Sequence, residues 1–329
     1  MTTFSKQRRQ AFLTKGYFEV SSDIIRMHGA ETERDISNPA FDVESLSLLC
    51  FRACQLYFES LSLNYTAGQP IEPLRSELES VVVAYERYML ALRAYEQDPT
   101  YPVFGFQEIA HFERMMQLMG LAYLLHRRDL IPRLHALIAD SAYDGTDAVY
   151  EELVGHVLPD RPYLENWYHQ LPYQHLLNAT DEPTPEGRTA ELKAYCLAWY
   201  RAMEEAPWHD SHLRIDGNDG DYFGYWAFEA GAIALLYDID DSSIKHMVYP
   251  KDLVAWSRSF QPESAGSAPA PTRLRIEAGQ PCPQTGWWMS PAKANFRRYF
   301  EQGSAMPSLG SDYGLTIWQW DADQSAPRL

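Results

Sequence analysis

The chain has 329 residues, 46% of them hydrophobic, which allows one large domain or two smaller ones with a sizeable core. Its formal net charge of −17 argues against a basic stripe for nucleic acid and favours a basic partner. No uncharged apolar run reaches the roughly 18 residues of a membrane span, and the basic N-terminus lacks the apolar segment of a secretory signal. We therefore expect a cytoplasmic protein that does not contact a membrane.

The negative charge is concentrated in two windows. Residues 140–192 hold 11 acidic and 2 basic residues, and residues 203–241 hold 10 acidic residues and 1 basic residue. The rest of the chain is close to neutral. Each window is either a solvated surface or a surface that recognises a partner, and charge alone leaves both open.

Apolar residues recur with the 3.6-residue period of a helix over most of residues 1–258, and glycine and proline punctuate the pattern. The fold class that we expect is mainly α, an antiparallel bundle or hairpin array of about nine helices. Beside a short helical arm at residues 6–28, the expected helices lie at residues 42–65, 74–96, 106–126, 130–141, 147–157, 163–177, 186–206, 225–237 and 251–258.

The four cysteines contain no CxxC spacing, and a chain of this size needs no disulfide framework. Cys50 and Cys54 are four residues apart on an apolar helical pattern, which is the spacing of buried neighbours. We expect these two, Cys196 and Cys282 to be reduced, as in a cytoplasmic protein.

The segment at residues 225–237 is apolar on all sides of its helical period, which is typical of a buried helix. Glu229 is the one ionisable residue within it. A buried carboxylate must be paired, hydrogen-bonded or neutral. We therefore predict a structural role for Glu229, held by a nearby base or tyrosine hydroxyl, with Trp226 and Phe228 as core neighbours.

Acidic, turn-rich segments lie on both sides of this helix. Because the helix itself is expected in the core, partner contacts would come from the loops at its ends, and few of their residues would dominate binding. Some of these aspartates, Asp240 and Asp241 above all, would instead cap helices. The candidate partner-binding residues are Asp216, Asp219, Asp221, Asp238, Asp240 and Asp241, with Trp208 and Tyr222 as aromatic anchors.

The C-terminal part of the chain changes character. Of the 14 residues at 259–272, 10 are Ser, Pro, Ala or Gly, which indicates a linker. Beyond it, residues 273–277 and 315–320 alternate with the period of a strand. We expect a helical domain at residues 1–258, a linker at 259–272, and a β module of four or five strands at 273–329.

The sequence offers little catalytic chemistry. His209 and His212, with the aspartates that follow, form one metal-like cluster. A calcium loop starting at Asp216 would need Gly at position 221 and an acid at 227, where this chain has Asp221 and Ala227. HExxH, GxSxG, Walker A and GxGxxG motifs are absent, so we expect no catalytic residue, metal or cofactor.

The block YFGYWAFEAGAIALLYDIDDSSIKHMVYPKDLVAW at residues 222–256 resembles the core motif of the PoNi-type immunity family. The matching pieces are YW, FEA, LLY, IDD and YPKDL, in this order. A weaker likeness extends back to about residue 40, and the last sixty residues lie outside it. There the pieces CPxTGWW, RRYF and IWQW are similar to tryptophan-rich C-terminal modules of secretion-linked immunity proteins.

This resemblance implies a helical protein that binds and inhibits a cognate antibacterial toxin, a nuclease, with no chemistry of its own. The negative net charge is consistent with a nuclease as the partner, because an acidic protein can occupy the basic cleft of a nuclease in place of phosphates. The implied partner is a basic toxin domain, without direct contact to nucleic acid. Two alternatives stay open: a metal-dependent hydrolase using residues 209–221, and a non-catalytic adaptor that docks through its β module.

Overall fold

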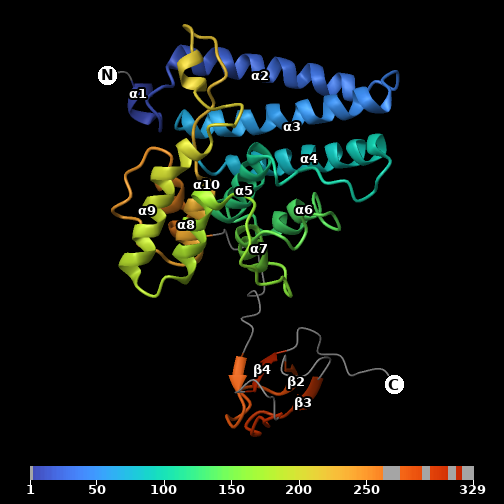
Figure 1. The fold of residues 1–329 in the computed structure, drawn as a ribbon, viewed down its shortest axis with the longest axis vertical. Coiled ribbons are helices and arrows are strands. Elements are labelled where there is room, and N and C mark those ends of the chain that lie inside the picture. The colour runs from blue at the N-terminus through green and yellow to red at the C-terminus, as the bar shows by residue number, and fades with distance from the viewer. Residues whose placement is uncertain (1–2, 262–274, 291–296, 310–315, 321–329) are drawn as a thin grey trace. The chain divides into compact units, whose positions relative to one another are not determined.

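The computed structural model describes residues 3–261, 275–290, 297–309 and 316–320 (Figure 1). The chain divides into two compact units, Met1–Phe260 and Gln261–Leu329. The described helices all lie in the first unit and the described strands in the second. The expected fold class, mainly helical with a small C-terminal sheet, is confirmed. Most of the linker expected at residues 259–272 lies outside the described residues.

The first unit begins with helices stacked side by side, as Figure 1 shows for α2, α3 and α4. The side chains of Thr14 and Asp42 cap α2 and α3 by accepting hydrogen bonds from backbone N–H groups. Among the described residues, no helix is long and apolar enough to cross a membrane. The bounds are α1 Thr3–Gln7, α2 Lys15–Ile36, α3 Val43–Thr66 and α4 Leu74–Glu96.

The helix expected at residues 6–28 is wrong in both bounds. The chain turns between α1 and α2, and α2 then continues through Gly29 to Ile36. An added Cβ at Gly29 would meet nothing within 4 Å, so this glycine lies on an open face of the helix. Its helix penalty of about 1 kcal/mol is offset by the good helix formers that follow it.

The second half of the unit is built from shorter helices. Its longest members, α5 and the antiparallel pair α8–α9, surround α10 (Figure 1). The bounds are α5 Ile109–Leu124, η1 Arg128–Leu130, α6 Ile131–His135, α7 Ala148–Gly155, α8 Gln170–Asp181, α9 Pro185–Ala202, η2 Ser211–Arg214, α10 Phe228–Leu236 and α11 Lys251–Ser259.

The helix expected at residues 163–177 begins only at Gln170. The preceding residues are extended because their backbone bonds to the start of α7 instead. Asn166 O accepts from the backbone N–H of Ala148 at 2.8 Å, and Tyr168 N–H donates to Asp147 Oδ2 at 2.9 Å. A tertiary contact therefore takes over the hydrogen bonds that a first helical turn would have made.

The buried helix α10 begins three residues later than expected, at Phe228. The side chain of Gln10 accepts from Tyr225 N–H at 2.9 Å and donates to Tyr225 O at 2.6 Å. Gln117 donates to Trp226 O at 2.9 Å. These two amides satisfy backbone groups that a helix would otherwise satisfy, so the segment before Phe228 stays extended.

Helices α5 and α10 come close together at Gly120. A Cβ added there would lie 2.5 Å from the backbone nitrogen of Glu229 and 2.6 Å from the carbonyl carbon of Phe228. Such contacts are shorter than real atoms allow, so only glycine fits between the two backbones. Gly231 likewise allows α10 and α11 to approach closely, because a Cβ added there would meet side-chain atoms of Pro250 and Val254 at 2.9 Å.

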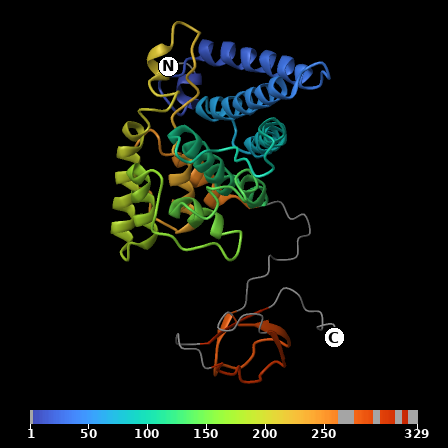
Figure 2. The ribbon, with the colours of Figure 1, turned by 45° about the vertical axis from the view of Figure 1, so that its right-hand side comes forward.

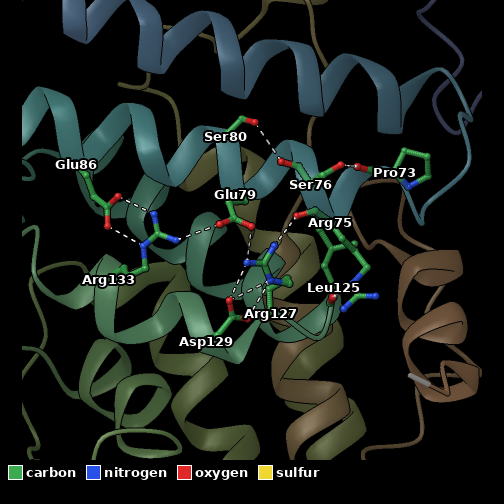
Figure 3. Close-up of polar contacts among 10 residues, drawn as sticks. All are labelled: Pro73, Arg75, Ser76, Glu79, Ser80, Glu86, Leu125, Arg127, Asp129 and Arg133. Atoms are coloured by element: carbon green, nitrogen blue, oxygen red, sulfur yellow. Dashed lines mark hydrogen bonds and ion pairs between the residues drawn. The ribbon is translucent and has the colours of Figure 1, made fainter. Parts of the chain in front are cut away.

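A network of ion pairs joins α4 to the connection between α5 and α6 (Figure 3). Arg127 pairs with Glu79 at 2.8 Å and with Asp129 at 2.7 Å, and Arg133 pairs with Glu86 at 2.6 Å. The hydrogen bonds from Arg127 lower the pKa of both Glu79 and Asp129. Single exposed pairs contribute only about 0–1 kcal/mol, so the network mainly sets the position of α4 against α6.

The second unit is a four-stranded antiparallel sheet in the order β1-β4-β2-β3 among the described residues. Its small core holds Cys282, Trp288, Phe300, Met306 and Trp318. The strands are β1 Arg275–Glu277, β2 Gly286–Met289, β3 Arg297–Phe300 and β4 Ile317–Trp320. The expected β module is therefore present, with its own core.

All four cysteines are free and buried. Burial raises the pKa of the Cys196 thiol to about 12 and that of Cys54 further still. These thiols are therefore protonated and act as small apolar side chains.

We predict that Gly120→Ala destabilises the first unit by about 3 kcal/mol, since the new methyl group would force α5 and α10 apart. Gly29→Ala is the matched control, because it lies inside a helix in open space and should gain up to about 1 kcal/mol. Urea unfolding followed by circular dichroism measures both. Equal stability of Gly120→Ala and the wild type would contradict the close packing.

We also predict that a chain ending at Phe260 folds alone with its full helix content. The ring of Phe260 stacks on His126 at 4.9 Å, and the Arg75 guanidinium lies 4.5 Å from its centroid. A chain ending at Arg258 loses these contacts and should be less stable by about 1–3 kcal/mol. Circular dichroism melts of both fragments test this, and an unfolded 1–260 fragment would mean that the two units share one core.

Candidate functional site

The segment that connects α9 to α10 lies against the beginning of α2 in both views (yellow in Figures 1 and 2). We refer to residues 207–224 as the acidic loop. Tyr222 N–H donates to the Tyr17 hydroxyl at 2.8 Å, and Thr66 Oγ1 donates to Phe223 O at 2.7 Å. Contacts with α2 and α3, which are distant in sequence, therefore fix the path of the acidic loop.

The three candidate aspartates of this loop, Asp216, Asp219 and Asp221, differ in their partners. Asp216 and Asp219 exchange two backbone hydrogen bonds of 2.9 Å across a tight turn, and both side chains are exposed. Neither forms an ion pair within 4.0 Å with a described residue. Asp221 pairs with Arg214 at 2.6 Å, and Arg214 also donates to His209 O at 2.9 Å. The loop thus presents two uncompensated carboxylates, whereas Asp221 is partly neutralised.

The two aromatic anchor candidates behave differently. Trp208 is half-buried and stacks on Trp199 with centroids 5.2 Å apart, so part of its ring stays accessible. Tyr222 is fully buried, packs edge-on against Tyr225 at 5.0 Å, and donates its hydroxyl hydrogen bond to Gln10. Tyr222 is therefore a core residue that anchors the loop, and its side chain is not exposed in this structure.

The aspartates after α10 are mainly structural. Asp241 is 6% exposed, accepts from the Tyr249 hydroxyl at 2.9 Å and pairs with Arg258 at 2.5 Å. Asp241 thus joins the end of α10 to α11 and is not available to a partner. Asp240 Oδ1 accepts from Ser242 N–H at 2.9 Å and so caps a turn. The expectation that Asp240 caps a helix is therefore wrong.

The two acidic turns lie at opposite ends of α10. Asp238 and Asp240 are exposed, but they follow the C-terminal end of α10, whereas the acidic loop precedes its N-terminal end. A helix of nine residues is about 13 Å long. Of the candidates named from sequence, the structure brings together only Trp208, Asp216, Asp219 and Asp221 on the same loop.

Glu229 lies fully buried in the first turn of α10. Its Oε1 accepts from the Tyr195 hydroxyl at 2.5 Å and from Trp199 Nε1 at 3.0 Å, while Oε2 has no hydrogen-bond partner. Burial raises the pKa of Glu229 to about 7, and the bonds from Tyr195 and Trp199 offset part of that rise. The carboxyl group ties α10 to α9, and its core neighbours Trp226 and Phe228 are buried too.

Beneath the acidic loop lies a cleft of about 290 Å³ that the sequence did not reveal. It lies between α3, α4, α5 and the loop, and we call it the inner cleft. Trp208 and Asp221 lie among its lining residues, so it adjoins the loop directly. The other ionisable lining residues are Glu59, Tyr85, Tyr88, His111, Glu113 and Arg114.

Two carboxyl groups of the inner cleft are shielded from water, Glu113 almost completely and Glu59 in part. Glu113 is 1% exposed, and its Oε1 makes no hydrogen bond. Burial raises the pKa of Glu113 to about 8 and that of Glu59 to about 7. The guanidinium of Arg114 lies 3.6 Å from the centroid of the Phe58 ring and forms no ion pair within 4.0 Å with a described carboxylate.

A signal for these two acids was present in the sequence. Glu113 lies three residues before Met116 and seven before Gly120, on the buried face of α5. Glu59 lies three residues after Leu56 and four before Leu63, along the buried face of α3. A carboxylate at a core position of an amphipathic helix is the pattern that would have identified them.

The histidines of the loop serve as packing and hydrogen-bonding groups. His212 Nδ1 lies 2.8 Å from the Tyr225 hydroxyl, and the His209 ring stacks on Tyr200 at 4.3 Å. Within the residues that the structure describes, no group of three His, Cys, Asp or Glu side chains is placed to hold a metal ion. The loop geometry therefore gives no support to a hydrolase at residues 209–221.

Comparison with known proteins places this region in a family of immunity proteins. Residues 145–253 match the family described as PoNe immunity proteins (PoNi), C-terminal, and this part of the chain is a PoNi C-terminal domain. The match confirms the resemblance inferred from residues 222–256 and extends it back to α7. It contains the acidic loop and α10. Proteins of this family protect against polymorphic toxins and bind cognate PoNe toxins.

A solved structure supports the fold beyond this domain. The structure described as "The Crystal Structure of Protein PA2201 from Pseudomonas aeruginosa" is similar with a TM-score of 0.58 and 19% identity, over 77% of this chain and 91% of that one. At this identity the likeness concerns the fold alone. No curated protein matches the sequence.

We predict that Glu229→Ala destabilises the protein by about 1–3 kcal/mol at pH 6, because it leaves Tyr195 and Trp199 unsatisfied. Glu229→Gln is the matched control, since its amide oxygen can still accept both bonds. The raised pKa of Glu229 means that the folded protein binds this proton more tightly than the unfolded chain does. Wild-type stability should therefore fall as the pH rises from about 5 to beyond 7.

The side chain of the Glu229→Gln variant cannot ionise, so its stability lacks the part of this pH dependence that comes from Glu229. The melting temperatures of wild type and variant should therefore converge or cross as the pH increases. The measurement is differential scanning calorimetry between pH 5.5 and 8.5. Wild-type melting behaviour of Glu229→Ala would show that the carboxyl group does not hold α10 to α9.

Proposed function

We propose that this chain is an immunity protein that binds one cognate toxin domain stoichiometrically and thereby blocks it, with no chemistry of its own. The observation that carries the proposal is the acidic loop within the PoNi C-terminal domain. Its two uncompensated carboxylates, Asp216 and Asp219, are exposed on the same loop as the half-buried Trp208. Exposed charge and a partly exposed aromatic residue on one loop are a common composition of a protein interface.

The toxin that fits this surface is a nuclease domain with a basic cleft. Carboxylates on a fixed loop can replace the phosphates that such a cleft binds, and the overall charge of −17 attracts a basic partner over distance. This steering acts on the association rate and weakens as salt screens the charges. The loop then blocks access of nucleic acid to the cleft.

The other acidic window is a weaker candidate because much of its charge is used internally. In residues 140–192, Asp144 and Glu151 both pair with Arg161. Asp147 is fully buried and caps α7 by accepting from two backbone N–H groups. A side chain engaged in this way cannot meet a partner without first losing its own contacts. Asp216 and Asp219 form no ion pair with a described residue, so they need not give up such a contact to meet a partner.

We predict that reversing Asp216 and Asp219 to lysine, alone or with Asp221, slows association with the toxin about tenfold at low salt. The double variant keeps the Arg214–Asp221 pair and therefore the loop itself. Stopped-flow measurements with the purified cognate toxin domain test the prediction, and the difference from wild type should shrink at high salt.

The matched control reverses three exposed acids outside the PoNi domain, Glu31, Glu96 and Glu108, which form no ion pair with described residues. It changes the net charge as much as the triple variant does but should slow association far less. An unchanged rate for the loop variants at low salt, with the fold intact, would exclude the loop from the interface and favour residues 140–192. Failure of the wild type to bind or neutralise the toxin would refute the proposed function.

A further inference from the structure

We propose that the inner cleft receives one cationic side chain, an arginine or lysine of the toxin, between the carboxylates of Glu59 and Glu113. This inference rests on the proposed function and names the anchor point within the same surface. The acidic loop would attract the partner, and the cleft beneath it would hold one of the partner's basic side chains.

The first argument is the unsatisfied carboxylate. Glu113 is 1% exposed and lines the cleft, yet its Oε1 has no hydrogen-bond partner. A buried acceptor without a donor is unfavourable, and more so if it is charged. A guanidinium or ammonium group that enters the cleft supplies the missing donors and a compensating charge. The cleft therefore has a vacant acceptor position for a cationic donor.

The second argument is the charge balance of the lining. Glu59, Glu113 and Asp221 line the cleft together with one guanidinium, that of Arg114, and Asp221 already pairs with Arg214 outside the lining. The guanidinium of Arg114 lies over the Phe58 ring and forms no ion pair within 4.0 Å with a described carboxylate. Burial raises the pKa of both glutamates, and the positive charge of Arg114 offsets only part of each rise. A second positive charge would favour their ionised forms.

The third argument is the size and character of the cleft. A volume of about 290 Å³ lies below the usual range for drug-sized ligands, but it accommodates a single long side chain. Its walls include the rings of Tyr88, Phe104 and Trp208. Aromatic faces stabilise cations and pack well against the apolar stem of lysine or arginine.

A fourth observation links the cleft to the partner surface. Asp221 and Trp208 belong both to the acidic loop and to the cleft lining. A toxin guided to Asp216 and Asp219 would thus have the cleft directly beside its contact residues. Buried, fully desolvated charge pairs of this kind chiefly determine how long a complex lasts, whereas rim charges determine how fast it forms.

The test uses the full chain and n-butylguanidinium chloride as the probe, with n-butylurea as the neutral probe of the same shape. Binding is followed by NMR through the indole N–H of Trp208. We expect saturable, millimolar binding of butylguanidinium and none of butylurea. Glu113→Gln and Glu59→Gln should each weaken it at least tenfold, and Glu108→Gln, an exposed acid next to α5, should leave it unchanged.

Glu113→Gln keeps the size and shape of the side chain, and circular dichroism melts verify that it folds. With the toxin, this variant should shorten the lifetime of the complex about tenfold while the low-salt association rate stays within about twofold. Equal binding of both probes, no saturable binding, or unchanged binding in both Gln variants would overturn the inference.

The two proposals fail in different ways. If the wild type captures the toxin but binds no butylguanidinium, the cleft inference alone is wrong. If the wild type does not capture the toxin, the proposed function is wrong, whatever the small probe does.

Discussion

The close approach of α5 and α10 at Gly120 is the constraint on which the first unit depends. Only a residue without a side chain lets the backbone of Phe228 and Glu229 lie against α5. Helix α10 then packs against α5, α8, α9 and α11, and its residues 228–234 are buried. In such a site a carboxylate must be bonded, and Glu229 meets this requirement through Tyr195 and Trp199.

The burial of α10 also explains the form of the acidic loop. A chain that enters a core must satisfy its backbone groups on the way, and here the amides of Gln10 and Gln117 and the hydroxyl of Thr66 do so. These partners come from three N-terminal segments. The loop is therefore held as firmly as a core element while its tip, with Asp216 and Asp219, stays in solvent. A preorganised tip loses little entropy when it binds.

Helices whose ends are marked by residues such as proline in the local sequence were predicted well. The bounds of α4 at Leu74–Glu96 follow from its apolar period and the flanking Pro73 and Asp98. Local pattern failed where distant residues determine the backbone, as at Tyr225, whose partner Gln10 is 215 residues away. It also failed to separate exposed from buried aspartates, because the burial of Asp241 depends on Arg258 and Tyr249. Such pairings have no signature in local spacing.

The carboxylates of this unit fall into two physical kinds, and the distinction bears on how an acidic protein can be both stable and selective. The carboxylates on the loop tip are exposed to water, so they act mainly on the rate at which a basic partner associates. Glu59 and Glu113 have lost most of their hydration, so their desolvation already reduces the free energy of unfolding. A partner with a correctly placed basic side chain would offset part of this desolvation energy by pairing with the two acids, and a partner without one would not. Specificity would then reside in the buried acids under the loop, and speed of capture in the exposed acids at its tip.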